Sequence, residues 1–284
     1  MAIDTHCHLT LRFEISEIPE VLSRARESGV NGVLLVGYCP VHYRKVGDIL
    51  DQMGTGASPI PALAGTLGIH PHEADNYGPD HIQALKSELD RPDIVALGET
   101  GLDFYRDYAS QDGQEKLFRA HVSLAAETGL PLILHSRSAF ERTVAILSES
   151  SLPNPPGVFH CYGYGAKELE TVLELGFFVS FAGNLTYAKA DELRRACRLV
   201  PPERVMVETD SPFLVPRKAK NSGVRRNEPG HVVETARELA RIRCWDFDWM
   251  ENRLARNVLA CFPRLLNINS WSELVKPDDG EVAA

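Results

Sequence analysis

The stretch "IVALGET", residues 94–100, places an acidic residue at the end of an apolar run. The four apolar residues predict a buried strand, and Glu99 lies where that strand should stop. A negative charge at this position needs an explanation. The stretch therefore predicts a strand that delivers a functional carboxylate at its carboxyl end.

Seven other short apolar runs resemble this one and recur along the whole chain. They are continuous rather than alternating, which is typical of strands buried on both faces of a parallel sheet. The eight runs are MAIDTHC (1–7), NGVLLVG (31–37), ALAGTLGIH (62–70), IVALGET (94–100), LPLILHS (130–136), PGVFHCY (156–162), FFVSFA (177–182) and RVMVETD (204–210).

Amphipathic stretches with helical spacing separate these runs. Eight strands alternating with helices predict an α/β protein, a single-domain (β/α)8 TIM barrel over residues 1–265, followed by a C-terminal tail at 266–284. An open doubly wound sheet is the alternative, but no GxGxxG follows the first run. The predicted helices are 18–29, 78–90, 112–129, 139–150, 165–176, 190–200 and 245–262.

The composition is that of a folded protein with no overall attraction to nucleic acid. Hydrophobic residues make up 44% of the 284 residues and the formal net charge is −9, so binding of a polyanion would need a local basic patch. Six cysteines without a CxxC pair predict reduced thiols and a cytoplasmic protein. We expect no secretory signal and no membrane span, because no apolar run approaches about 20 residues. No obligatory protein partner is expected.

Six titratable residues lie at the predicted strand ends. In a barrel these ends converge on one mouth, where active sites of this fold lie. His6 and His8 share one face of an extended chain because they are two residues apart. Four imidazoles and two carboxylates suit a divalent metal, and more comfortably two metals that share a carboxylate. The six are His6, His8, Glu99, His135, His160 and Asp210.

The chain resembles the TatD family of metal-dependent hydrolases. Seven stretches carry the resemblance, in family order: DTHCHL (4–9), GIHPH (68–72), GETGLDFYRD (98–107), PLILHSR (131–137), FHCYGYG (159–165), ETDSPFL (208–214) and RNEPGHV (226–232). The resemblance implies two divalent ions, such as Zn, Mn or Mg. It assigns His6, His8, Glu99 and Asp210 to one ion, and Glu99, His135 and His160 to the other.

The expected chemistry is hydrolysis by a water whose pKa the metals lower. Asp210 is the expected general base and Glu99 the bridging carboxylate. His70 and His72 are expected at the mouth but off the metal set. There they contact substrate phosphate or, for His72 in particular, protonate the leaving oxygen; capping of a neighbouring backbone group is the alternative.

Further residues near the mouth are expected to touch substrate or support the ligands. Asp103 either hydrogen-bonds a metal-ligating histidine or caps its own turn, and Arg137 either binds phosphate or pairs with Glu141. A basic stretch after the last strand, with Arg225 and Arg226 as candidate substrate contacts, suits a polyanion; a solvated loop is the alternative. Four other histidines are expected at the surface: His42, His81, His121 and His231.

The leading functional hypothesis is a deoxyribonuclease of the 3'-5' exonuclease type that acts on single-stranded or frayed DNA ends, as the resemblance implies. RNA or tRNA is a related possible substrate. The alternatives are a metal-dependent ester hydrolase such as a D-aminoacyl-tRNA deacylase, or a small-molecule amidohydrolase. A non-catalytic nucleic-acid binder is disfavoured because all six candidate ligands are present.

Overall fold

The computed structural model describes residues 2–54 and 59–275 and contains one eight-stranded sheet. Its strands follow one another in chain order, and every neighbouring pair is parallel. The strands are β1 (Ala2–Cys7), β2 (Val30–Gly37), β3 (Ala62–Leu67), β4 (Ile94–Asp103), β5 (Leu132–Arg137), β6 (Gly157–Phe159), β7 (Phe178–Phe181) and β8 (Val205–Val207).

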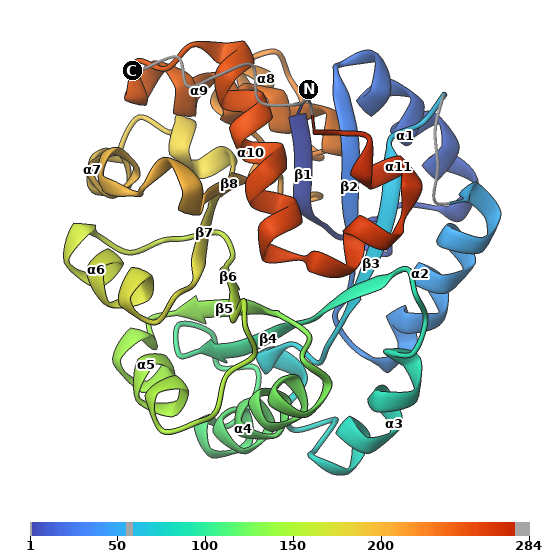
Figure 1. Cartoon of the computed structure of the whole chain (residues 1–284), viewed down its shortest axis with the longest axis vertical. Helices are drawn as coiled ribbons and strands as arrows, with labels where there is room; N and C mark the ends of the chain where they lie inside the picture. Colours follow the sequence, from blue (N-terminus) through green and yellow to red (C-terminus); the bar gives the residue numbers. More distant parts are fainter. Residues whose placement is uncertain (1, 55–58, 276–284) are drawn as a thin grey trace.

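Helices surround the strands, which confirms the predicted (β/α)8 barrel (Figure 1). The helices α2, α8, α9 and α11 were not among the predicted ones. The α-helices are α1 (Ile18–Glu27), α2 (Pro40–Met53), α3 (Asp80–Glu88), α4 (Gln111–Thr128), α5 (Phe140–Ser148), α6 (Ala166–Glu174), α7 (Asp191–Leu199), α8 (Arg217–Asn221), α9 (Val232–Arg243), α10 (Phe247–Cys261) and α11 (Asn269–Ser272). Short 3-10 turns are η1 (Ile15–Glu17), η2 (Pro71–Glu73), η3 (Gly183–Thr186), η4 (Pro202–Arg204), η5 (Pro229–His231) and η6 (Pro263–Asn267).

The helix ends follow from local sequence. In α4 the Ser110 hydroxyl accepts a hydrogen bond from the Gly113 amide at 3.2 Å, which satisfies a free donor of the first turn. Gly129 ends the same helix in the left-handed region, with φ 70°. Similarly, Asp246 caps α10 by accepting from the Trp249 amide at 2.9 Å.

The segment after β8 closes the barrel against β1. The Asp210 amide donates to the His6 carbonyl at 3.0 Å, and the His8 amide donates to the Ser211 carbonyl at 2.8 Å. Asp4 reinforces the seam, because its carboxylate accepts from the Thr209 amide at 2.8 Å. Closure therefore places Asp210 directly beside the two histidines of β1.

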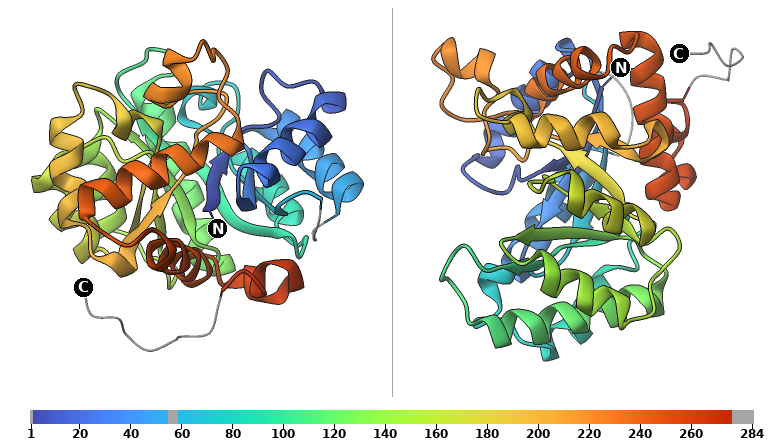
Figure 2. Two further views of the ribbon diagram at one scale, coloured as in Figure 1. Left: turned by 90° about the horizontal axis from the view of Figure 1, so that it is seen from above. Right: turned by 90° about the vertical axis from the view of Figure 1, so that its left-hand side faces the viewer.

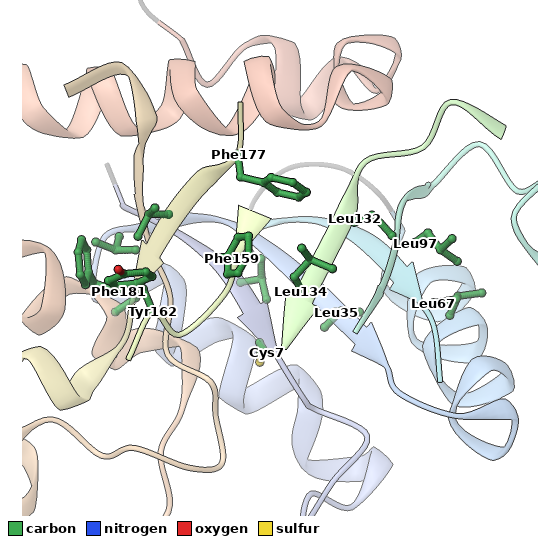
Figure 3. Packing of buried hydrophobic residues seen from close by; sticks show 14 of the residues in the cluster. Cys7, Leu35, Leu67, Leu97, Leu132, Leu134, Phe159, Tyr162, Phe177 and Phe181 are labelled. Atoms are coloured by element: carbon green, nitrogen blue, oxygen red, sulfur yellow. The ribbon is translucent and has the colours of Figure 1, made fainter. Parts of the chain in front are cut away.

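Two apolar clusters hold the barrel together. The larger one lies between strands and helices, and Figure 3 shows part of it, including Leu97, Leu132 and Phe159. The smaller one receives a side chain from each of the eight strands and is covered by α10, η6 and α11. These helices lie in front of the strands in Figure 1, and Figure 2 gives two further views of them.

Part of the C-terminal tail predicted for 266–284 packs against the barrel. Ile268 and Trp271 pack into the smaller cluster, and Trp271 is completely buried. Their apolar surface covers the amino-terminal end of the barrel, so this segment is part of the core. The predicted loose stretch at 276–284 lies outside the described residues.

The prediction that Glu99 ends its strand is wrong, because β4 continues to Asp103. Between Leu97 and Thr100 the β4–β5 register shifts, so three steps along β4 match two along β5. Such a bulge redirects a side chain, here Glu99. Gly101, with φ 138°, permits the close approach to β5, since a Cβ atom there would lie 2.0 Å from the His135 carbonyl oxygen.

Alternate residues of a strand point to the same face, and on the inward faces these residues change from apolar to polar toward the carboxyl ends. Ile133 and Val158 belong to the inner apolar cluster, and His135 and His160 follow two residues later on the same faces. In the same way Glu208 follows Met206. The polar side chains therefore meet at the carboxyl ends of the strands.

Two broader features bear on where the protein works. All six cysteines are free thiols, four of them buried, as the sequence predicted. Among the described residues, no helix has the length and apolar character needed to cross a membrane.

Candidate functional site

A cavity of about 1180 Å³ opens at the carboxyl ends of the strands. Its floor is formed by predicted ligands and its rim by aromatic and basic side chains. The lining includes His8, Glu99, His135, His160 and Asp210 below, and Arg12, Arg106, Arg137, Tyr108 and Phe213 around them. His6 lies beneath the floor and is completely buried.

One oxygen of Glu99 faces the histidines of the first strand. Its Oε2 atom lies 3.3 Å from His6 Nε2 and 3.4 Å from His8 Nε2. The two Nε2 atoms are 3.0 Å apart. Asp210 Oδ1 completes the group at 3.5 Å from His8 Nε2 and 3.9 Å from His6 Nε2. Four donor atoms predicted for one ion thus converge.

The other oxygen of Glu99 faces a second set of imidazoles. Its Oε1 atom lies 2.8 Å from His160 Nε2 and 2.9 Å from His135 Nδ1, and these two nitrogens are 3.4 Å apart. His70 Nε2 is also close, at 3.3 Å from Oε1. His70 therefore lies within ligand distance of Glu99, whereas the sequence placed it off the metal set. The loop after β3 folds inward, which its local sequence does not reveal.

This donor set fits two divalent ions that share Glu99. Ligand atoms about 2.1 Å from one ion in a tetrahedral arrangement lie about 3.4 Å apart, and the observed spacings run from 2.8 to 3.9 Å. In two groups of three residues, the ligand atoms, one from each residue, all lie within 4.8 Å of one another. The groups are His6, His8 and Glu99, and His70, Glu99 and His135. Two imidazole nitrogens facing each other at 3.0 Å can share at most one proton, and a cation between them would use both lone pairs.

The electrostatics keep the carboxylates ionised. Burial raises the pKa of Glu99, but its interactions with the surrounding imidazoles, the strongest with His160, outweigh burial and hold the pKa well below its ordinary value. Burial lowers the pKa of His8, yet hydrogen bonds with Asp210 and Glu99 outweigh burial and raise it to about 9. Burial dominates at His70 and lowers its pKa to about 4, so this imidazole is neutral at pH 7.

Glu208 is a site residue that the sequence analysis missed. It is completely buried. Its Oε1 accepts from the Cys161 amide at 2.7 Å and faces His160 Nδ1 at 3.2 Å, while Oε2 accepts from the Ser180 hydroxyl. Glu208 thereby orients the His160 ring. Its position two residues beyond the inward-facing Met206 of β8 was the available signal.

Asp103 performs both of the roles that the sequence left open. Its Oδ2 lies 3.0 Å from His135 Nε2 and 2.9 Å from His72 Nε2. Its Oδ1 accepts from the amides of Tyr105 and Arg106 at 2.9 and 3.0 Å. The carboxylate caps its turn and joins a candidate ligand to His72, whose side chain is 26% exposed at the cavity wall.

The predicted basic contacts divide into two groups. Arg137 lines the cavity and stacks over Tyr105, with its Cζ 4.0 Å from the ring centroid; within the described chain it makes no ion pair with Glu141. Arg225 is exposed, and neither it nor Arg226 is among the residues that line the cavity. Arg226 is held by Glu17 at 3.2 Å. Arg226 also donates to the carbonyl of Arg12, a residue of the cavity rim, at 2.8 Å, and its role as a substrate contact stays a prediction.

Three of the four histidines predicted at the surface are not exposed. His121 is completely buried and its Nε2 accepts from the Ile69 amide at 3.0 Å, so it supports the loop that carries His70. His42 is buried beside the Tyr38 ring. His231 is partly buried near Asn227, and His81 is exposed as predicted. The helical pattern alone does not show which face of a helix meets a loop.

Comparisons of the sequence and of the structure with known proteins find the same group of relatives. The family described as "TatD related DNase" matches residues 3–263. The "3'-5' ssDNA/RNA exonuclease TatD" of Klebsiella pneumoniae is 34% identical over 245 residues, covering 86% of this chain and 90% of the relative. The "uncharacterized metal-dependent hydrolase YabD" of Bacillus subtilis is 28% identical, covering 95% and 100%. The crystal structure of YJJV, a TatD homolog from Escherichia coli, superposes with a TM-score of 0.83 at 25% identity and covers 92% and 98%.

Proposed function

Because the chain belongs to the TatD-related DNase family, we propose that it is a metal-dependent 3'-5' exonuclease acting on single-stranded ends of DNA or RNA. The observation that carries the proposal is Glu99, whose two oxygens face separate sets of imidazoles at the floor of one cavity. This arrangement suits two divalent ions per chain, such as Zn, Mn or Mg.

His6, His8, Glu99 and Asp210 would hold one ion, and Glu99, His135 and His160 the other. A divalent ion held there supplies Lewis-acid stabilisation of phosphoryl oxygens and lowers the pKa of water. Asp210 accepts the proton of the attacking water. Burial raises its pKa, but the hydrogen bond with His8 and nearby imidazole charge outweigh burial and keep Asp210 ionised.

The residues above the floor suit a nucleotide chain that enters end first. His72, fixed by Asp103, lies at the wall and protonates the leaving oxygen, and His70, whose ring lies beside that of His72, contacts the substrate phosphate. Arg137 binds phosphate at the rim. The exposed ring of Tyr108, which lines the cavity, suits base stacking. A cavity closed at its floor admits a strand end more readily than a continuous duplex.

Six free cysteines suit a reducing compartment, which supports a cytoplasmic location. Single-stranded DNA or RNA is the proposed partner, and the absence of an obligatory protein partner stays a prediction.

The test is digestion of a single-stranded oligonucleotide labelled at either its 5' or its 3' end, with Mn²⁺ or Mg²⁺. We expect a ladder that shortens from the 3' end of the 5'-labelled strand and early release of a labelled mononucleotide from the other. Asp210→Asn should reduce the rate by at least about 10² while keeping the wild-type circular dichroism spectrum. Wild-type rates in that variant would contradict the assigned base, and hydrolysis of D-tyrosyl-tRNA without DNA products would contradict the nuclease proposal.

A further inference from the structure

A second cavity of about 850 Å³ lies outside the catalytic one. Its walls come from the end of η3 with the residues that follow it, and from α7, α8 and α9. We call it the α8–α9 groove and define it by its charged lining residues Arg194, Arg217, Lys218, Glu234, Arg237, Glu238 and Arg241, together with Thr186 and Tyr187.

Two of the groove's arginines are already engaged by the protein. Arg241 donates two hydrogen bonds to Glu238, both at 2.8 Å. Arg194 donates to Asp191 at 2.7 Å and to the Tyr187 carbonyl at 2.8 Å. These guanidiniums shape the wall and are poorly available to a ligand.

Three further cations of the groove are exposed and uncommitted. Among residues 2–54 and 59–275, the side chains of Arg217, Lys218 and Arg237 make no hydrogen bond or ion pair. Glu234 is the one groove carboxylate that Arg241 does not engage. In a protein of net charge −9, an excess of free cations in one concavity marks a site for an anionic ligand.

The groove adjoins the catalytic cavity. Asn184 and Leu214 line the catalytic cavity, whereas Thr186 and Arg217 line the groove. The Arg217 amide donates to the Thr186 hydroxyl at 2.8 Å, so the two connecting segments lie side by side. Two or three residues span at most about 7 to 11 Å, so a strand of a few nucleotides can reach from one cavity to the other.

We propose that the α8–α9 groove binds the phosphate backbone of the single-stranded polynucleotide whose 3' end lies in the catalytic cavity. The proposal rests on the proposed function. Arg217, Lys218 and Arg237 contact successive phosphates, and the half-buried Tyr187 ring offers a face for a base. The groove therefore distinguishes long strands from di- and trinucleotides.

The experiment measures equilibrium binding of a fluorescent 20-residue oligothymidylate by the metal-loaded enzyme. Phosphorothioate linkages at its 3' end slow hydrolysis, and fluorescence anisotropy is followed from 50 to 200 mM salt. The test variant is Arg217→Gln/Lys218→Gln/Arg237→Gln. The matched control, Arg44→Gln/Lys45→Gln/Arg198→Gln, removes the same charges from exposed positions that line neither cavity.

We expect the test variant to raise the Kd at least tenfold and to reduce the slope of log Kd against log salt by about 2, since each single-strand phosphate contact contributes about 0.7. The control should bind like the wild type. If the test variant keeps the wild-type affinity and salt dependence, the proposal that the groove binds the phosphate backbone is wrong. An equal loss of affinity in the control variant, or no binding by the wild-type enzyme, would also contradict it.

Hydrolysis of a dinucleotide by the wild-type enzyme tests the proposed function separately. If the dinucleotide and an unmodified 20-mer both remain intact, the nuclease proposal fails, and the binding data still decide whether the groove holds a polynucleotide. If both are cut, the ratio of kcat/KM for the 20-mer to that for the dinucleotide should fall in the test variant. An unchanged ratio would contradict a role of the groove in strand binding.

Discussion

Replacing Glu208 by glutamine tests whether a residue that touches no substrate controls metal binding. A metal ligand at His160 Nε2 requires the proton on Nδ1, and Glu208 accepts it at 3.2 Å. Glutamine keeps the shape and one acceptor oxygen but removes the charge. A hydrogen bond to a charged group contributes about 1.5–3 kcal/mol against about 0.5–1.5 for a neutral one. The difference of about 1–2 kcal/mol corresponds to a loss of roughly 5- to 30-fold in metal affinity.

The assay is titration of chelator-treated protein with Mn²⁺ or Zn²⁺ against a competing indicator. Glu115→Gln is the matched control, because Glu115 lies on α4 and pairs with Arg142 on the surface. Its metal affinity should equal that of the wild type. Thermal unfolding checks that both variants are folded. A folded Glu208→Gln protein with wild-type metal affinity would refute the argument that this carboxylate sets the state and orientation of His160.

Gly101→Ala should lower the free energy of unfolding by several kcal/mol or prevent folding, because the added Cβ meets the His135 carbonyl. Gly129 also has a positive φ, 70°, but its surroundings are open, so Gly129→Ala should lower the free energy of unfolding by only about 1–2 kcal/mol. Equal melting temperatures of the two variants would contradict this difference. Burial lowers the pKa of His121 to about 4, so the unfolded chain takes up a proton near pH 6.5 that the folded chain refuses. The free energy of unfolding should therefore fall as the pH drops from about 6.5 to 4. His121→Gln should reduce this pH dependence by up to about 1.4 kcal/mol per pH unit. If denaturant titrations at pH 5 and pH 7 give the wild type and the variant the same change in the free energy of unfolding, the argument is contradicted. Trp271→Ala should cost about 3–5 kcal/mol in the same titrations, whereas a residue of a loose tail would cost almost nothing.

Much of the fold and most of the site were contained in local sequence patterns. Continuous apolar runs such as 31–37 indicate strands buried on both faces. A polar residue two places beyond an inward apolar one, as His135 follows Ile133, lies on the same face and nearer the carboxyl end. Because parallel strands deliver those ends to a single mouth, side chains far apart in the sequence could be predicted to meet.

Contacts between elements were decided only by the tertiary structure. The bulge in β4 redirects the Glu99 side chain, and closure of the barrel brings Asp210 against β1. The inward fold of the loop at His70 and the ion pair of Arg226 likewise depend on segments distant in the chain. Periodicity reports which face of its own element a residue occupies. Cross-strand register and loop packing, which choose its partner, come from the interactions of the whole barrel.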